Sequence, residues 1–188
     1  MESKLQIISG KFRGRKLALP LNARPTQNRT RIALFNMLNE ILPSGPVAVW
    51  DAFAGSGAFG IEFLSRGWAI NTIFTDTNSG SLESVKKNLA GFEPYEFIVR
   101  KADAVFAAKE FAPRIDLCFI DPPFANPELG DGLVRQLCKY AKPGTFVVWE
   151  MDKGHEPKTS GFEILKDKTY GRARFLIMQK QADENEST

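Results

Sequence analysis

From residue 47 onward, short apolar runs alternate with segments in which apolar residues recur every three or four positions. Short runs bounded by turn signals are typical of strands buried on both faces, and the wider spacing is typical of helices packed on one side. The pattern predicts strands at 47–51, 69–76, 95–100, 117–120, 145–151, 163–169 and 173–179, and helices at 58–66, 79–90, 103–111 and 128–142. Repeated strand–helix units predict an α/β fold with a mostly parallel sheet between helix layers.

The last two predicted strands form an exception to the parallel arrangement. They are joined only by residues 170–172, which is too short for a crossover connection, so this pair must be antiparallel. Arg172 lies in this join and Arg174 just after it, and they either extend a binding surface or are plain surface residues.

The first 46 residues follow a different pattern. Residues 5–19 are typical of a hairpin around a turn, and a helix is predicted at 29–41 before Pro43, Gly45 and Pro46 end it. We therefore expect a basic N-terminal extension at 1–43, an α/β domain at 44–180 and a frayed polar tail at 181–188.

Composition excludes several classes of protein. No apolar stretch approaches the roughly 20 residues that a membrane span needs, and the N-terminus lacks the apolar core of a signal peptide. The two cysteines and the single histidine form no metal-ligand pattern, so no metal is expected. We expect a soluble, cytoplasmic protein.

Positive charge is concentrated at the N-terminus. Residues 1–31 hold eight Lys and Arg and one Glu, a net charge of +7, whereas the whole chain has +3. A basic arm on a mildly acidic body indicates a polyanionic partner, and we favour nucleic acid over a merely solvated surface. Phe12 lies among the cations, which suits base stacking beside phosphate contacts. The cations expected to bind nucleic acid are Lys11, Arg13, Arg15, Lys16, Arg24, Arg29 and Arg31.

A glycine-rich stretch follows the first predicted strand. Asp51-Ala-Phe-Ala-Gly-Ser-Gly-Ala-Phe-Gly60 contains G-x-G-x-x-G before a helix, and Asp76 ends the next strand, where an acidic residue holds ribose hydroxyls. The pattern fits a dinucleotide or another adenosine-bearing cofactor. Asp51 favours the second, because a carboxylate there repels a pyrophosphate but suits an ammonium or a sulfonium. Asp103 is expected either to accept a hydrogen bond from an adenine amino group or to cap the next helix.

A second motif, Asp121-Pro122-Pro123-Phe124, follows the fourth predicted strand. Proline has no N–H for a central strand ladder, and it holds the preceding residue extended. The result is a stiff loop with one carboxylate, carbonyl acceptors and a ring, which suits gripping an amino group on a planar base. The other interpretation is a strand ended by proline, with Asp121 capping the next helix.

Together these motifs resemble those of class I S-adenosylmethionine-dependent methyltransferases that act on amino nitrogens. The N-terminal Ile8-Ser-Gly-Lys-Phe-Arg-Gly-Arg-Lys-Leu17, Arg24-Pro-Thr26, Arg29-x-Arg31 and Ala33-Leu-Phe-Asn36 are similar to the RsmD family of bacterial 16S rRNA guanine-N2 methyltransferases. The resemblance extends to about residue 179. It departs at Asn28 and Ile32, where the family usually has Asp and Glu, and neither position belongs to the catalytic motif.

The resemblance implies a three-layer, Rossmann-like fold with a seven-stranded sheet of order 3-2-1-4-5-7-6, strand 7 antiparallel, plus the N-terminal β-hairpin. It implies S-adenosylmethionine as cofactor and small-subunit rRNA, in an assembling or assembled ribosomal subunit, as partner. The methionine part of the cofactor would lie along the glycine loop, Asp76 would hold the ribose and Asp103 the adenine. The implied cofactor residues are Asp51, Phe53, Ala54, Gly55, Ser56, Gly57, Asp76 and Asp103, and the implied catalytic residues are Asp121, Pro122, Pro123 and Phe124.

Three other functions compete with this one. An amino methyltransferase acting on adenine or cytosine in DNA usually needs a separate target-recognition domain, and one acting on protein glutamine typically has Asn-Pro-Pro-Tyr. A nicotinamide-dependent oxidoreductase would leave the Asp-Pro-Pro-Phe loop unexplained. A non-catalytic RNA-binding module would have no need of acidic residues at 51, 76 and 121.

Overall fold

The computed structural model describes residues 5–21 and 28–182, and the chain divides into two units after Lys101. The first unit contains α1 (Asn28–Ile41), β1 (Val47–Asp51), α2 (Ala58–Arg66), β2 (Ala69–Asp76), α3 (Ser79–Leu89) and β3 (Glu96–Lys101). The second contains α4 (Ala104–Phe111), the 3-10 turn η1 (Ala112–Arg114), β4 (Leu117–Ile120), α5 (Glu128–Tyr140), β5 (Phe146–Asp152), β6 (Phe162–Tyr170) and β7 (Ala173–Lys180).

The strands of the first unit are all parallel. β2 pairs with β1 on one side and with β3 on the other. Every residue of β1 is buried, which explains why its first four residues, Val47 to Trp50, are all apolar. Helix α2 lies close to β2 because Gly60 has no side chain: a Cβ there would lie 2.5 Å from the Phe74 ring. The third glycine of the motif is therefore a packing residue.

The second unit combines parallel and antiparallel pairing. β4 pairs with β5 in parallel, whereas β7 is antiparallel to both β5 and β6. The register of the β5–β7 pair places Asp152 opposite Ala173, so the end of β5 lies beside the turn between β6 and β7. The predicted antiparallel pair at the end of the chain is confirmed.

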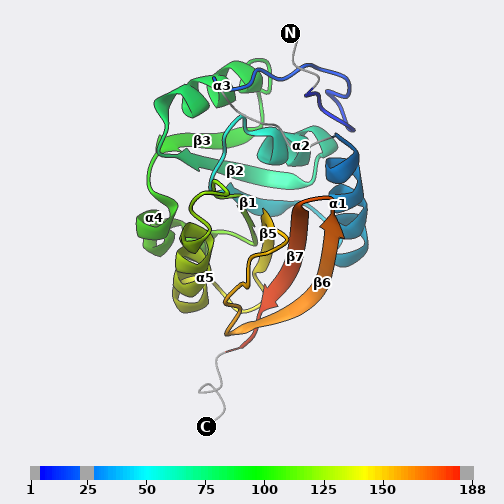
Figure 1. The fold of residues 1–188 in the computed structure, drawn as a ribbon. Coiled ribbons are helices and arrows are strands. Elements are labelled where there is room, and N and C mark those ends of the chain that lie inside the picture. Colours follow the sequence, from blue (N-terminus) through cyan, green and yellow to red (C-terminus); the bar gives the residue numbers. More distant parts are fainter. Residues whose placement is uncertain (1–4, 22–27, 183–188) are drawn as a thin grey trace. The chain divides into compact units, whose positions relative to one another are not determined.

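Within the described residues, the seven strands form one sheet in the order β3-β2-β1-β4-β5-β7-β6, with β7 antiparallel. Figure 1 shows β3, β2 and β1 side by side in the first unit, and β5, β7 and β6 in the second. The predicted fold class and strand order are confirmed. Element ends differ by one or two residues in several places. Helix α5 ends at Tyr140 and not at 142, because Pro143 disfavours a helical conformation in the residue before it. In the described part of the chain, no helix is long and apolar enough to span a membrane.

The N-terminal hairpin is present, but its two arms pair only briefly. Gln6 and Lys16 form an isolated antiparallel bridge, flanked by backbone hydrogen bonds from Leu17 N to Leu5 O and from Ile7 N to Arg15 O. The pairing ends there because the backbone of the hairpin loop turns to α2. Lys11 N–H donates to the carbonyl of Ser65 at 2.7 Å.

The hairpin belongs to the first structural unit, and the predicted division of the chain at residue 43 stays a prediction. Of the tail predicted at 181–188, residues 183–188 lie outside the described residues.

Candidate active site

The glycine loop follows β1 and has a backbone that only glycine adopts readily. Gly55 and Gly57 have φ angles of 53° and 76°, in the left-handed region. The N–H of Gly57 donates to the Ala54 carbonyl at 2.6 Å, which closes a tight turn. A Cβ added to Gly55 would meet nothing within 4 Å, so this side of the loop is open. The loop therefore has room for a ligand against its backbone.

Asp51 is the last residue of β1, and its carboxylate is buried behind the loop. Its exposed fraction is 1%, and it accepts a hydrogen bond from the backbone N–H of Gly60 at 3.1 Å. Burial raises the pKa of Asp51 to about 7; the hydrogen bond from Gly60 opposes the shift and the charge of Asp76 adds to it. A ligand with a positive group would stabilise the ionised form, whereas a pyrophosphate would be repelled.

Asp76 ends β2 and holds the glycine loop in place. Its Oδ2 accepts from Gly55 N–H at 2.9 Å, and its Oδ1 accepts from Asn78 N–H at 2.8 Å. The sequence suggested only a ribose-binding role for this residue. In the structure, Asp76 has a structural role: from the neighbouring strand it fixes the backbone of the glycine loop.

Asn88 is a site residue that the sequence reasoning missed. Its side-chain amide donates to the carbonyls of Ser56 at 2.9 Å and Ala18 at 3.0 Å, and its oxygen accepts from Ala18 N–H at 2.7 Å. One buried side chain therefore holds both the glycine loop and the N-terminal segment. The sequence feature that could have indicated Asn88 is its position as a polar residue on the apolar face of α3, directly before Leu89.

In the second unit, Asp103 caps α4. Its Oδ1 accepts from the backbone N–H groups of Val105 at 2.8 Å and Phe106 at 3.3 Å. Of the two roles expected for Asp103, the helix cap is therefore present, and adenine binding stays a prediction.

The Asp-Pro-Pro-Phe loop begins where β4 ends. Asp121 is half-buried, Pro122 is buried, and Pro123 is exposed. Phe124 has an exposed fraction of 47%, which is high for a large apolar side chain. The cap position of α5 is Pro127, and no side chain caps this helix. The interpretation of Asp121 as a helix cap is therefore wrong.

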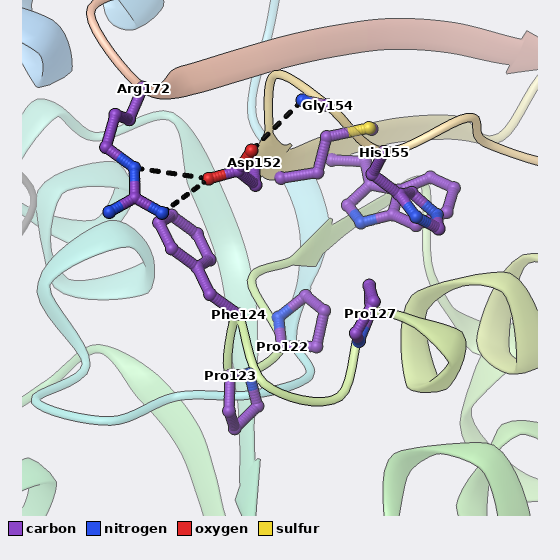
Figure 2. A pocket seen from close by; sticks show the side chains of 10 residues that line it. Pro122, Pro123, Phe124, Pro127, Asp152, Gly154, His155 and Arg172 are labelled. Carbon is purple, nitrogen blue, oxygen red and sulfur yellow. Dashed lines mark hydrogen bonds and ion pairs between the residues drawn. The ribbon is translucent and has the colours of Figure 1, made fainter.

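A cavity of about 390 Å³ lies beside this loop (Figure 2). Its walls come from the loop, from the end of β5 and from the β6–β7 turn. The lining residues are Pro122, Pro123, Phe124, Pro127, Trp149, Met151, Asp152, Gly154, His155 and Arg172. The volume is within the range of small-ligand sites, and most of the lining is apolar or aromatic.

Asp152 and Arg172 form the charged part of this cavity. Arg172 Nη2 lies 2.9 Å from Asp152 Oδ2, and Gly154 N–H donates to Asp152 Oδ1 at 3.0 Å. The hydrogen bond from Gly154, followed by that from Arg172, lowers the pKa of Asp152. The carboxylate is therefore ionised at neutral pH. No pattern in the sequence indicates that Asp152 belongs to a site.

Most cations of the N-terminal segment are exposed. Lys11, Arg13, Lys16 and Arg29 face solvent, while Arg15 is half-buried with its guanidinium 5.4 Å from the Phe92 ring centre. Arg24 lies outside the described residues.

Two expectations for this segment need correction. Arg31 is only 5% exposed and pairs with the buried carboxylate of Glu62 at 3.3 Å, so it is not available to a phosphate. Phe12 was expected to stack on a base, but its ring stacks on Phe92 with centroids 4.0 Å apart. Both side chains hold the N-terminal segment against the rest of the first unit.

The strand order with an antiparallel β7, together with a glycine loop directly after β1, defines the class I methyltransferase fold. The chain belongs to the RsmD family: a family model described as conserved hypothetical protein 95 matches residues 5–179.

Named relatives cover nearly the whole chain. A protein of Haemophilus influenzae called ribosomal RNA small subunit methyltransferase D is 31% identical over 188 residues, or 95% of each chain. A putative rRNA methyltransferase of Bacillus subtilis, YlbH, is 33% identical and aligns with 94% of this chain and 100% of its own. Among solved structures, a putative methyltransferase of Escherichia coli, yhhF, has a TM-score of 0.80 at 28% identity, covering 96% of this chain and 100% of its own.

Proposed function

We propose that this protein transfers a methyl group from S-adenosylmethionine to the exocyclic N2 of a guanine in small-subunit (16S) rRNA. The observation that carries the proposal is the Asp-Pro-Pro-Phe loop beside a ligand-sized cavity, in a chain that belongs to the RsmD family. The Haemophilus influenzae relative, named as a small-subunit rRNA methyltransferase, supports the choice of substrate.

The glycine loop suits S-adenosylmethionine. The open side of Gly55 leaves room for the methionine part, and the buried Asp51 carboxylate favours its positive charge. When bound, this cofactor supplies an activated methyl group on a sulfonium. The residues that would hold its methionine part are Asp51, Phe53, Ala54, Gly55, Ser56 and Gly57. Asp76 would hold the ribose, and the Asp103 oxygen that is not used in the helix cap would accept from the adenine amine.

The Asp121–Phe124 loop would prepare the target amine. The N2 lone pair of guanine is delocalised into the ring, which makes the nitrogen a poor nucleophile. Hydrogen bonds from its two N–H groups to the Asp121 carboxylate and the Pro122 carbonyl would turn the lone pair out of the ring system. Asp121 would then stabilise the positive charge that develops on the nitrogen. The methylated nitrogen is strongly acidic, so it loses its proton without a dedicated base.

Phe124 would stack on the base once it has left any helical stack. Its exposed ring already lines the cavity, so no rearrangement of the loop is needed to present it.

The exposed cations of the N-terminal segment would contact phosphates, which position RNA without reading its sequence. Lys11, Arg13, Arg15, Lys16 and Arg29 serve this role in our proposal, as does Arg24. Arg31 is left out because it is buried. The partner would be rRNA in an assembling or assembled small subunit, in the cytoplasm.

One experiment tests the proposed reaction directly. Labelled S-adenosylmethionine is supplied with protein-free rRNA, purified small subunits or DNA, and the labelled nucleoside is identified after digestion. We expect label only as N2-methylguanosine of the small-subunit rRNA. Label on adenine, on cytosine or on protein would overturn the substrate, and absence of label from every substrate would overturn the reaction.

Neutralising the exposed arm is expected to weaken RNA binding and to flatten its salt dependence. The variant replaces Lys11, Arg13, Arg15 and Lys16 with glutamine, which removes the charge but keeps a polar side chain with part of the aliphatic stem. Each lost phosphate contact lowers the slope of log affinity against log salt by about 0.7–0.9. A binding titration at several salt concentrations measures the slope.

The matched control removes four exposed cations from the second unit: Lys109, Arg135, Lys139 and Lys168. It has the same net charge as the arm variant and should keep most of the wild-type slope. Equal losses in the two variants would show that only total charge matters and that the arm has another role.

A further inference from the structure

The cavity wall contains an ion pair that the proposed reaction does not use. Asp152 ends β5, and Arg172 lies in the turn between β6 and β7, so two strands that pair in the sheet bring them together. In Figure 2 the guanidinium of Arg172 is directed toward the ring of Phe124, and both residues line the same cavity. A charged group in this position is available to a base that stacks on Phe124.

We propose that Arg172, oriented by Asp152, reads the O6 and N7 acceptors of the target guanine. This assignment rests on the proposed function, and it adds a specificity-determining residue to the same site.

The ion pair fixes which donors of Arg172 remain. Both Nε, at 3.3 Å, and Nη2, at 2.9 Å, donate to Oδ2 of Asp152. The turn itself is held by the N–H of Lys153, which donates to the Arg172 carbonyl at 2.9 Å. A guanidinium has five N–H groups in one plane, so a pair of donors on Nη1 and Nη2 is left on its far edge. This edge is a planar fork with a set direction.

The geometry of guanine matches such a fork. Its O6 and N7 atoms are adjacent acceptors, and they lie away from the 2-amino group that Asp121 and Pro122 would grip. A bidentate pair between arginine and these two atoms is the commonest base-specific contact of proteins with guanine. Adenine has an amino group in place of O6, so its N–H donors would face the N–H donors of Arg172. Arg172 would therefore attract guanine and reject adenine with the same edge.

Truncation of Arg172 should leave the fold intact because the ion pair contributes little to stability. Its side chain is 76% exposed, and exposed pairs contribute little to stability. Lys142 provides a control in the same unit: it is 52% exposed, pairs with Asp116 at 3.1 Å and does not line the cavity. Unchanged melting temperatures of both alanine variants would show that neither truncation disturbs the fold.

The experiment combines protein variants with changes in the target base. RNA fragments are prepared with guanosine, 7-deazaguanosine (no N7) or 2-aminopurine ribonucleoside (no O6) at the methylated position. Methyl transfer to each is measured for the wild-type protein, Arg172→Ala, Arg172→Lys and Lys142→Ala. We expect Arg172→Ala to lower kcat/KM on guanosine by roughly 10- to 100-fold. Arg172→Lys should restore only part of this loss, because an ammonium is not a planar fork.

The decisive measurement is whether the effect of the modified base on kcat/KM depends on the presence of Arg172. Removing N7 or O6 should slow the wild-type protein and Lys142→Ala, but it should cause little further loss in Arg172→Ala. If the base changes cost the Arg172→Ala variant as much as the wild type, the assignment of Arg172 is wrong even though guanine is the substrate. If the wild-type protein methylates no guanine at all, the proposed function fails and the assignment falls with it.

Discussion

Replacing Asp121 with alanine is expected to lower the rate of methyl transfer by at least roughly 10²–10³-fold, the usual cost of removing one group that stabilises charge in a transition state. Cofactor binding should stay within about twofold of wild type, because the residues proposed to hold the cofactor do not include Asp121. Single-turnover rates with saturating RNA, together with calorimetric titration of S-adenosylhomocysteine, measure the two quantities separately.

The expected size of this effect follows from the chemistry of the amine. A neutral N2 becomes positively charged as the methyl group arrives, and Asp121 would be the anionic partner of that nitrogen. Asp121→Asn keeps an oxygen acceptor but loses the negative charge, so it should recover little of the activity. The two variants together separate hydrogen bonding from charge stabilisation.

A matched control is available directly before β4. Asp116 has a 41% exposed side chain and pairs with Lys142 at the surface. Asp116→Ala should therefore keep nearly full activity. If Asp121→Ala turns over at a rate close to that of Asp116→Ala, the Asp-Pro-Pro-Phe loop does not carry the chemistry and the proposed mechanism is wrong.

The parts of the fold that the sequence predicted well are those that depend on local features. The run Leu117–Ile120 is fully apolar and is followed by two prolines, so both the strand and its end are evident from neighbouring residues. The glycine loop is similar, because the left-handed angles of Gly55 and Gly57 are requirements of the turn itself. The short link at residues 170–172 was enough to predict an antiparallel pair.

The parts that could not be predicted depend on partners far away in the sequence. Arg31 looks like one more cation of a basic arm, yet it is buried and pairs with Glu62, on the inner face of α2. Glu62 pairs with Arg66 as well, at 2.8 Å. Glu62 also accepts from the backbone N–H groups of Ile8 and Ser9, at 2.8 and 2.9 Å. Nothing in the local pattern shows which charges of a basic segment face inward.

The same reason explains why the charged end of the cavity was missed. Asp152 and Arg172 are brought together by the register of β5 against β7, and a shift of one residue would direct the side chains to opposite faces of the sheet. Composition and spacing contain no information on that register. Sequence patterns therefore indicated the loop that we propose to grip the amine, but not the charged pair that lines the cavity beside it.

Asp51→Asn is expected to stabilise the ligand-free protein at neutral and alkaline pH. Burial raises the pKa of this carboxyl to about 7, above the ordinary value of 3.8 that applies to an unfolded chain. Between these two values the unfolded state has lost the proton and the folded state keeps it, so stability falls as pH rises and levels off above about pH 7. About three pKa units correspond to a cost on the order of 4 kcal/mol at most. An asparagine has no such cost and can still accept from Gly60 N–H.

Thermal unfolding from pH 5 to pH 8 tests this. Other groups titrate in both proteins, so the relevant quantity is the difference in melting temperature between Asp51→Asn and wild type. That difference should increase through pH 5–7, by roughly 5–10 °C, because about 1 kcal/mol corresponds to about 2–4 °C in a chain of this size. Asp116→Asn serves as the control for removing one carboxylate that is not buried.

Ligand binding should show the opposite preference of the same residue. A sulfonium or ammonium favours the ionised carboxylate. As the pH is raised toward 7, the affinity of the wild-type protein for S-adenosylmethionine should therefore increase by up to about tenfold per pH unit, and above pH 7 it should level off. Asp51→Asn should bind weakly and independently of pH in this range. The variant would thus be more stable but less able to bind cofactor, which is the trade-off expected of a charge buried for function. If the variant binds as tightly as wild type at pH 8, the carboxylate does not contact the cofactor and its burial needs another explanation.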